Sequence, residues 1–346
     1  MNLISSQTNS LNGKVVCPGD KSISQRILIL GSLLNCNTSI KGFLDAYDPN
    51  STLNALNLIG SSIVKTRTRI ILNKRSQPFK MPDKDLDLGN SGTGMRLMLG
   101  LLSGLGIRAT LTGDSSLSKR PMLRVIKPLM DMGANIKSND GKAPIKIIES
   151  NISNDFKYDM PIASAQVKSS LLLASLSSNK SITITEPKIT RNHTERMIEY
   201  FGGDIQYDDK TRKGYIKLGK KNLIPKESYE VVGDFSSASF MIVAALIAKE
   251  SNLVIKNVGL NPTRSGLINI LLQMGANIEV KNQTLISNEE SADLIVKSSS
   301  LHGIEVPENI IPNIIDEIPI LSIAAAFSEG TTIIKNASEL RVKESD

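Results

Sequence analysis

The sequence M-G-A-N-I stands at Met132–Ile136 and again at Met274–Ile278. Two related stretches, L-I-G-S-S-I at Leu58–Ile63 and F-G-G-D-I at Phe201–Ile205, complete a series of four whose first glycines are 73, 69 and 73 residues apart. Each stretch ends an amphipathic pattern at a glycine, the residue preferred at the left-handed position after a helix. Four such stops in register predict a structural repeat of about 70 residues.

Each repeat is expected to run strand, buried helix, strand, amphipathic helix and a hairpin of strands. The first helix is apolar nearly all round, as in M-R-L-M-L-G-L-L from Met95 and F-M-I-V-A-A-L-I from Phe240, and such helices belong inside a protein. The strands alternate instead, as in S-I-T-I-T from Ser181, which indicates one solvent-facing side. We therefore expect an inside-out α/β barrel of βαβαββ units with helices inside and sheets outside. No G-x-G-x-x-G follows a strand, so Rossmann-type binding is not supported.

The repeat also predicts how the chain divides into domains. Buried helices are expected to begin near Ser22, Gly92, Ser164, Phe235 and Asp316. Three complete units then fall in a domain of residues 19–232, while 1–18 and 233–346 form a second domain with the fourth unit and part of a fifth. The chain ends where the second helix of the fifth unit should begin, so we expect a fragment that lacks its last units. The helices at Phe240 and Ile318 should consequently expose apolar faces.

Composition excludes several classes of function. The chain has 346 residues, of which 40% are hydrophobic and 22% charged, enough for two or three domains with large cores. Aromatic residues make up 4% and Trp is absent, which argues against base-stacking platforms for single-stranded nucleic acid. The formal net charge of +7 comes without a run of five or six cations. We interpret it as steering for small anions and expect no nucleic-acid partner.

Metal sites, cofactors and membranes find no support either. The two cysteines and two histidines match no zinc spacing, disulfide framework or Ser-His-Asp triad, so we expect no metal and no cofactor. Residues 1–12 lack the pattern of a signal peptide. Apolar stretches such as 240–248 are far too short to span a membrane. The expected location is the cytoplasm.

The segment Pro18–Arg26, P-G-D-K-S-I-S-Q-R, predicts an anion site. A Pro-Gly turn ends the strand Lys14–Cys17, and a helix begins near Ser22, where backbone N–H groups without an intrahelical partner can bind an oxyanion. Lys21 lies at that end, and Arg26 falls four residues after Ser22 on the same face. Phosphate and carboxylate are the expected ligands. The alternative interpretation is a serine cap with solvated cations.

A second helix start of this kind lies in Leu88–Met98, L-G-N-S-G-T-G-M-R-L-M. Gly92 and Gly94 remove side chains where the backbone turns into a helix, so a ligand can approach the N–H groups closely. Asn90 and Thr93 can cap the helix or donate to a ligand. An ordinarily capped helix with flexible glycines is the alternative.

Other helix starts carry cations or amides as well. Arg96 lies on the first turn after the glycines, and Arg120 opens the next helix just before a proline. Ser164 and Gln166 start the third buried helix, and Arg191 precedes the amphipathic helix of that unit. Cations at a helix start oppose the helix dipole unless an anion joins them. The recurrence therefore predicts anion binding.

Acidic residues open the later helices. Asp234 is interpreted as an ordinary helix cap. Asp316, and Glu344 beside Lys343, are candidates for general acid–base work against bound anions, with capping as the alternative.

Together these stretches resemble the 3-phosphoshikimate 1-carboxyvinyltransferase family, also called 5-enolpyruvylshikimate-3-phosphate synthases, from Gly13 onward. The most specific matches are P-G-D-K-S-I-S-Q-R, L-G-N-S-G-T-G-M-R and R-V-K-E-S-D at Arg341–Asp346. The resemblance implies six repeat units in two domains with helices inside. It also implies transfer of the enolpyruvyl group of phosphoenolpyruvate to the 5-hydroxyl of shikimate 3-phosphate, with release of phosphate and without a metal. The reaction belongs to the shikimate pathway, and glyphosate takes the phosphoenolpyruvate position.

The resemblance also assigns residues. Those matched to shikimate 3-phosphate contacts are Lys21, Ser22, Arg26, Ser164, Gln166, Arg191, Asp316 and Lys343. Those matched to phosphoenolpyruvate contacts are Lys21, Asn90, Gly92, Arg120 and Gln166. The implied catalytic residues are Lys21, Asp316 and Glu344. The chain departs from the family at Ala165, where many members have Ser, and after K-E-S-D, where the family has Arg.

Two alternatives stay open. UDP-N-acetylglucosamine enolpyruvyl transferase shares the fold and the donor, but it has a reactive Cys in its second unit and a K-N start, whereas this chain has no Cys after Cys36 and reads Lys21-Ser22. The other alternative is an inactive anion-binding fragment of the same fold. The expected partners are the two small-molecule substrates, with the protein as a monomer.

Overall fold

A computed structural model describes residue 4 and residues 8–208, 214–219 and 223–342. The chain divides into two compact units, Asp20–Val231 and Met1–Gly19 with Val232–Asp346, which we call the middle unit and the terminal unit. The repeat count had placed the boundaries at 19–232 and at 1–18 with 233–346.

The described part of the middle unit holds three four-stranded sheets. In hydrogen-bonding order, the first contains β13 (Ser228–Glu230), β2 (Thr38–Lys41), β4 (Ile70–Asn73) and β3 (Ser62–Lys65). The second contains β5 (Leu86–Asp87), β6 (Ala109–Thr112), β8 (Lys142–Ser150) and β7 (Ala134–Asn139). The third contains β9 (Phe156–Asp159), β10 (Ile182–Glu186), β12 (Gly214–Leu218) and β11 (Ile205–Asp208). In each sheet the first two strands are parallel and the other pairs antiparallel.

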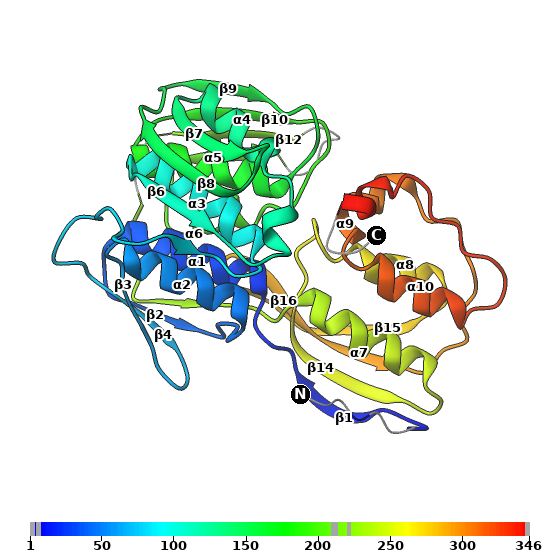
Figure 1. Cartoon of the computed structure of the whole chain (residues 1–346). Helices are drawn as coiled ribbons and strands as arrows, with labels where there is room; N and C mark the ends of the chain where they lie inside the picture. Colours follow the sequence, from blue (N-terminus) through cyan, green and yellow to red (C-terminus); the bar gives the residue numbers. More distant parts are fainter. Residues whose placement is uncertain (1–3, 5–7, 209–213, 220–222, 343–346) are drawn as a thin grey trace. The chain divides into compact units, whose positions relative to one another are not determined.

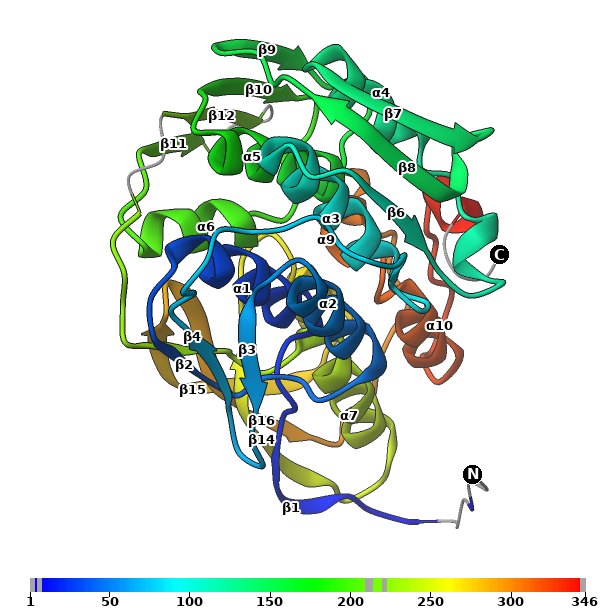
Figure 2. The ribbon, with the colours of Figure 1, turned by 60° about the vertical axis from the view of Figure 1, so that its left-hand side comes forward.

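Helices fill the inside of the middle unit, as predicted (Figure 1 and Figure 2). They are α1 (Lys21–Leu34), α2 (Tyr47–Leu58), α3 (Gly92–Leu105), α4 (Leu123–Asp131), α5 (Ala165–Ser178) and α6 (His193–Tyr200), with a short 3₁₀ helix at Leu117–Lys119. The first helix of each repeat is buried along almost its whole length. Helices α3 and α5 approach closely because Gly100 and Gly104 lack side chains, since a Cβ on Gly100 would stand 2.1 Å from the carbonyl oxygen of Ser170.

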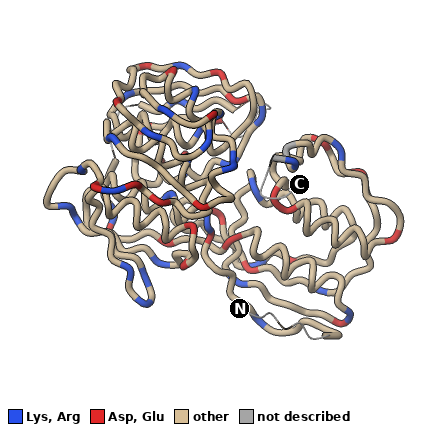
Figure 3. Tube along the Cα trace, in the orientation of Figure 1, with Lys and Arg blue, Asp and Glu red and all other residues tan. Residues whose placement is uncertain are grey.

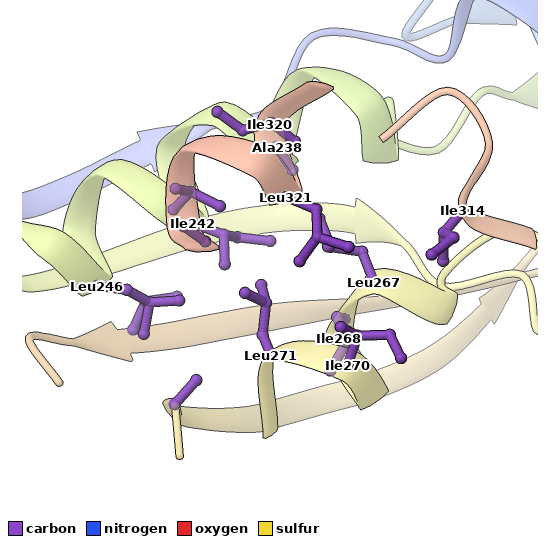
Figure 4. Close-up of a cluster of buried hydrophobic side chains, with 14 of the residues drawn as sticks. Ala238, Ile242, Leu246, Leu267, Ile268, Ile270, Leu271, Ile314, Ile320 and Leu321 are labelled. Atoms are coloured by element: carbon purple, nitrogen blue, oxygen red, sulfur yellow. The ribbon is translucent and has the colours of Figure 1, made fainter. Parts of the chain in front are cut away.

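The terminal unit repeats this plan once. Its sheet contains β1 (Asn12–Val16), β14 (Asn252–Gly259), β16 (Glu289–Lys297) and β15 (Asn277–Ile286). Its helices are α7 (Phe235–Ile247), α8 (Gly266–Gln273), α9 (Ile311–Ile314) and α10 (Ile318–Ala326), with 3₁₀ turns at Glu308–Ile310 and Ser338–Val342. Apolar side chains from the helices form a core against the sheet, with Ile242, Leu271 and Leu321 among them (Figure 4).

The predicted repeat is confirmed, down to the glycines that end the amphipathic helices. Gly60, Gly133, Gly202 and Gly275 all have positive φ, between 69° and 113°. The strand partners show an exchange that the repeat pattern does not predict. Strand β1 pairs with β14 in the terminal unit, and β13 pairs with β2 in the middle unit, so each of these edge strands joins the sheet of a repeat other than the one whose buried helix follows it.

The expectation that the helix at Phe240 exposes an apolar face is confirmed, since Phe240 on α7 is 60% exposed. The helix at Ile318 also exposes apolar side chains as expected: Ile318 itself is buried, but Ile323 on α10 and Phe327 at its C-cap are exposed. Within the described residues, no single helix is long and apolar enough to cross a membrane. The pair Glu308–Ile314 and Ile318–Ala326 reaches that length and apolarity only together, and it is bent by 114°.

Candidate active site

The start of α1 presents Lys21 and Ser22, as the sequence predicts, but neither caps the helix. Asp20 is the N-cap, and its Oδ1 accepts the backbone N–H of Ile23 at 2.8 Å. Lys21 is exposed, with its Nζ 3.6 Å from Asp48 Oδ2, and Ser22 is half-buried. The alternative of a serine cap is therefore wrong, because Asp20 fills that role.

Arg26 is a buried cation that joins three helices of the middle unit. Its side chain is 3% exposed. Nε donates to Thr194 Oγ1 on α6 at 2.8 Å, Nη2 donates to Ser169 Oγ on α5 at 2.9 Å, and Nη1 donates to the Ser22 carbonyl at 3.2 Å. A guanidinium with its planar donors fixed in this way supplies positive charge at the start of α1 without having to reorganise.

Helix α3 begins at Gly92 among arginine side chains. Ser91 is the N-cap, with its Oγ accepting the N–H of Gly94 at 2.9 Å, so the cap is neither Asn90 nor Thr93. A Cβ built on Gly92 would lie 3.1 Å from Nη1 of both Arg96 and Arg120. Glycine therefore leaves two guanidinium groups close to a bare helix start, where the backbone dipole also favours an anion.

A polar chain holds Arg120 in this place. Its Nη2 donates to Asn90 Oδ1 at 2.5 Å, and Asn90 Nδ2 donates to Asp114 Oδ2 at 2.9 Å. Asp114 also accepts the backbone N–H groups of Leu117 at 2.7 Å and Ser116 at 2.9 Å. The N–H of Leu117 is the main cause that lowers the pKa of the Asp114 carboxyl below its ordinary value, with Asn90, Ser116 and Arg120 contributing. The carboxylate thus stays charged and keeps Asn90 oriented toward Arg120.

Gln166 joins the two predicted helix starts. Its Oε1 accepts from Arg96 Nη1 at 2.6 Å and from Arg124 Nη2 at 3.4 Å, while its Nε2 donates to Thr93 Oγ1 at 2.8 Å. Residues separated by about 70 positions in the sequence are thereby brought into one cluster, as the prediction of related helix starts requires.

The third helix start is also as predicted. Ser164 is the N-cap of α5, and its Oγ accepts the N–H of Val167 at 3.4 Å, which leaves its hydroxyl hydrogen able to donate to a ligand. Arg191 is half-buried in the loop before α6, whose N-cap is Asn192. Sequence reasoning did not assign Arg96 or Arg124 to a ligand, although Arg96 stands four residues after Gly92 on the same face of α3. Arg120 does not open the next helix as expected, because its backbone is extended and α4 begins at Leu123.

The terminal unit holds Asp316, which is exposed and precedes the N-cap position of α10. That position belongs to Glu317, which is buried and accepts from Ser236 Oγ at 2.5 Å. Asp316 therefore lies one residue before the N-cap position, and the side chain of Glu317 makes no capping hydrogen bond. Asp234 is the cap of α7, as interpreted, with its Oδ1 2.8 Å from Ser237 N. Lys343 and Glu344 lie outside the described residues.

The charges of the molecule agree with small anionic ligands. Lys and Arg residues are spread over each unit instead of forming one continuous stripe (Figure 3). Among the residues that the structure describes, no three His, Cys, Asp or Glu side chains gather as a metal site.

Comparisons with known proteins agree on one family. The family model described as EPSP synthase (3-phosphoshikimate 1-carboxyvinyltransferase) matches residues 5–346. The 3-phosphoshikimate 1-carboxyvinyltransferase of Petrotoga mobilis is 49% identical over 98% of this chain and 79% of its own length, and that of Hydrogenovibrio crunogenus is 46% identical over 97% and 77%.

Solved structures agree with the sequence relatives. An EPSP synthase from Acinetobacter baumannii is 42% identical and covers 97% of this chain and 76% of its own, with a TM-score of 0.85. The enolpyruvyl transferase NikO from Streptomyces tendae is 15% identical over 94% of this chain and 74% of its own, with a TM-score of 0.72, which shows a shared fold.

Proposed function

The chain belongs to the EPSP synthase (3-phosphoshikimate 1-carboxyvinyltransferase) family, and from this premise we propose which of its residues bind the substrates and carry the chemistry. The family is a transferase family of the shikimate pathway, which leads to the aromatic amino acids. Its substrates are phosphoenolpyruvate and shikimate 3-phosphate. The alternative of a UDP-N-acetylglucosamine enolpyruvyl transferase has no support among relatives this similar.

The phosphoenolpyruvate site is proposed at the start of α3, and one observation carries it. Two guanidinium groups, those of Arg96 and Arg120, lie against the bare backbone of Gly92, while Gln166 holds Arg96 in place. Phosphoenolpyruvate has a phosphate and a carboxylate on adjacent atoms, and planar guanidinium groups bind such oxyanions with paired hydrogen bonds. Asn90 supports Arg120, and Lys21 is assigned to the same ligand by the family match.

The shikimate 3-phosphate site is proposed along the starts of α1, α5 and α6. Its residues in the middle unit are Lys21, Ser22, Arg26, Ser164, Gln166 and Arg191. The family match also assigns Asp316 and Lys343 to this ligand. Arg26 supports this assignment because hydrogen bonds fix its guanidinium in place. Ser164 supports it because its hydroxyl oxygen accepts the capping bond and its hydroxyl hydrogen can still donate to the ligand. With Ala165 in place of the family's Ser, these groups carry more of the phosphate binding.

Catalysis is assigned to Lys21, Asp316 and Glu344. The methylene carbon of phosphoenolpyruvate must gain a proton while the 5-hydroxyl oxygen attacks the neighbouring carbon and loses its own. Elimination of phosphate then removes a proton from the new methyl group, so the same groups can act twice. Two carboxylates serve this cycle if one is held protonated by its surroundings. Lys21 would balance the charge of the departing phosphate. A cytoplasmic location, a monomeric state and independence from cofactors stay predictions.

The test is the release of phosphate from phosphoenolpyruvate that depends on shikimate 3-phosphate. Release that depends on UDP-N-acetylglucosamine instead would overturn the proposal. Because the chain spans 79% of the length of its Petrotoga mobilis relative, the assay is paired with calorimetric binding of shikimate 3-phosphate. Binding without turnover would favour the alternative of an inactive anion-binding fragment. The absence of both binding and turnover would refute the proposed site.

A further inference from the structure

A fully buried ion cluster lies behind the proposed shikimate 3-phosphate site. Lys168 Nζ on α5 is 2.9 Å from Glu186 Oε1 at the end of β10 and 2.8 Å from Glu195 Oε1 in the first turn of α6. All three side chains are only 1% exposed. None of them is assigned to substrate or to chemistry by the family match.

Stability alone does not account for this cluster. Removing a lysine and two carboxylates from water costs several kcal/mol per ion, and apolar side chains of similar size often serve a core equally well or better. Burial by itself would lower the pKa of Lys168, but the carboxylates of Glu195 and Glu186 outweigh it and raise the pKa above its ordinary value. The ammonium therefore stays charged, and the cluster is a fixed set of directional bonds.

Those bonds converge on one loop residue. Thr190 donates its backbone N–H to Glu186 Oε1 at 3.1 Å and its hydroxyl to Glu186 Oε2 at 2.6 Å, and its carbonyl accepts from Lys168 Nζ at 3.3 Å. Every hydrogen-bonding group of Thr190 is thus engaged by the cluster. The next residue in the chain is Arg191.

The same lysine is tied to the start of α5. The backbone N–H of Lys168 donates to the carbonyl of Ser164 at 3.1 Å, and Gln166 lies between them in the first turn. Lys168 therefore connects the helix start that carries Ser164 to the loop that carries Arg191.

We propose that Lys168, Glu186 and Glu195, acting through Thr190, are positioning residues that set Arg191 against the start of α5 for the phosphate of shikimate 3-phosphate. The inference rests on the proposed function, and specifically on the role of Arg191. It predicts that loosening Thr190 weakens this ligand even though Thr190 itself does not touch it.

The experiment is calorimetric binding of shikimate 3-phosphate to single variants of the whole chain. Thr190→Val keeps the shape of the side chain but removes the hydroxyl that Glu186 holds, and we expect affinity to fall about tenfold, the scale of one hydrogen bond to a charged group. Thr190→Ser restores the hydroxyl and should restore the affinity. Thr183→Val on β10 makes the same chemical change outside the cluster and should leave binding unchanged. A loss in Thr190→Ser equal to that in Thr190→Val would overturn the inference.

Arg191→Ala separates this inference from the proposed function. If Arg191→Ala binds as tightly as the unmodified chain, the proposed role of Arg191 is wrong, and the inference falls with it. If Arg191→Ala binds weakly but Thr190→Val binds normally, only the inference is wrong. In the double variant, Thr190→Val should cause no further loss, because both changes act through the same guanidinium. An additive further loss would contradict positioning through Arg191.

Glu195→Gln tests the cluster without altering Thr190, and it decides the question if Thr190→Val fails to fold. Of its two oxygens, Oε1 binds Lys168 and Oε2 is buried without a hydrogen-bond partner, so an amide fits with little change of shape. Weaker binding of shikimate 3-phosphate that disappears in the Arg191→Ala background is expected. Unchanged binding by Glu195→Gln would overturn the inference.

Discussion

Arg96 Nη1 lies 2.6 Å from Gln166 Oε1, and this hydrogen bond joins α3 to α5 near the ends where both helices begin. The amide of Gln166 is oriented by a second bond from its Nε2 to Thr93 Oγ1. The side chain is therefore a neutral bridge that holds a guanidinium without cancelling its charge. That property matters in a site whose two substrates are both anions.

Changing the bridge to an acid should weaken the binding of both substrates. Gln166→Glu keeps the size of the side chain but places a negative charge where the amide oxygen now stands, 2.6 Å from Arg96 Nη1. We expect affinity for shikimate 3-phosphate to fall at least tenfold, because the new carboxylate repels the anion and partly neutralises Arg96, while the Thr93 hydroxyl can turn to donate to it. Calorimetry measures it. Gln206→Glu on the exposed face of β11 changes the net charge equally, and an equal loss there would contradict a local effect.

Gly92 should control sensitivity to glyphosate. A methyl group at this position would stand 3.1 Å from Nη1 of Arg96 and of Arg120, so both guanidinium groups must shift. We expect the unmodified protein to be inhibited by glyphosate, and Gly92→Ala to weaken the inhibitor more than the smaller phosphoenolpyruvate. Inhibition constants and phosphoenolpyruvate affinities measured on both proteins check this. Equal losses for the two ligands would contradict the steric explanation.

Asp114 should make the loop before Arg120 sensitive to acid. The N–H of Leu117, first among its partners, lowers the pKa of the carboxyl below its ordinary value of 3.8. A depressed folded-state pKa gives stabilisation that is present above the unfolded value and is lost as pH falls through the folded one. Thermal unfolding below about pH 4 should therefore depend less on pH in Asp114→Asn than in the unmodified chain. Asp140→Asn, in an exposed turn of the same unit, is the control, and identical pH profiles for all three proteins would refute the prediction.

The contact between α3 and α5 should tolerate no side chain at Gly100. A Cβ there would meet the backbone carbonyl of Ser170 at 2.1 Å, and backbone cannot move aside cheaply. Gly31→Ala on α1 is a matched control, because its Cβ meets only the flexible end of Leu72. We expect Gly100→Ala to lose about 1–3 kcal/mol of unfolding free energy or more, and Gly31→Ala clearly less. Equal losses in denaturant unfolding would show that the two helices adjust.

The fold could be predicted from the sequence because its strongest signals are local and recur. The glycines that end helices, such as Gly60 and Gly133, indicate a left-handed backbone position. The alternation in Ile182–Glu186 indicates a strand with one buried face. Because both patterns recur along the chain, each repeat strengthens the prediction. The predicted domain boundaries already placed β1 in the terminal unit and β13 in the middle unit. Their pairing with β14 and β2 could not be predicted, because a short alternating strand carries no information about its partner. The exposure of Phe240 was expected from the repeat count and not from the residue itself, because an apolar residue indicates where burial is favourable and not whether a partner is present.

The candidate site was predicted in part for a related reason. Helix starts that are rich in cations can be recognised in the sequence. In the structure, Gly92 lies beside Arg120 and Arg96, and Gln166 binds Arg96, as expected for one cluster. The caps Asp20 and Ser91 were missed because several neighbouring side chains could have served equally well. The buried ion cluster on α5 was also missed, since the single lysine in an apolar helix shows its partners only after the chain has folded.

Asp316 should be needed for turnover more than for binding. It is exposed and lies one residue before the N-cap position of α10, which Glu317 occupies. A positioned acid or base contributes about a hundredfold or more to rate. Asp316→Ala should therefore lower the turnover number by at least about a hundredfold and change the Kd for shikimate 3-phosphate far less, and Glu344→Ala should behave alike. Glu308→Ala, which removes an exposed carboxylate from the same unit, should leave both quantities unchanged. Near-normal turnover of Asp316→Ala with weakened binding would make the residue a ligand contact and remove it from the chemistry.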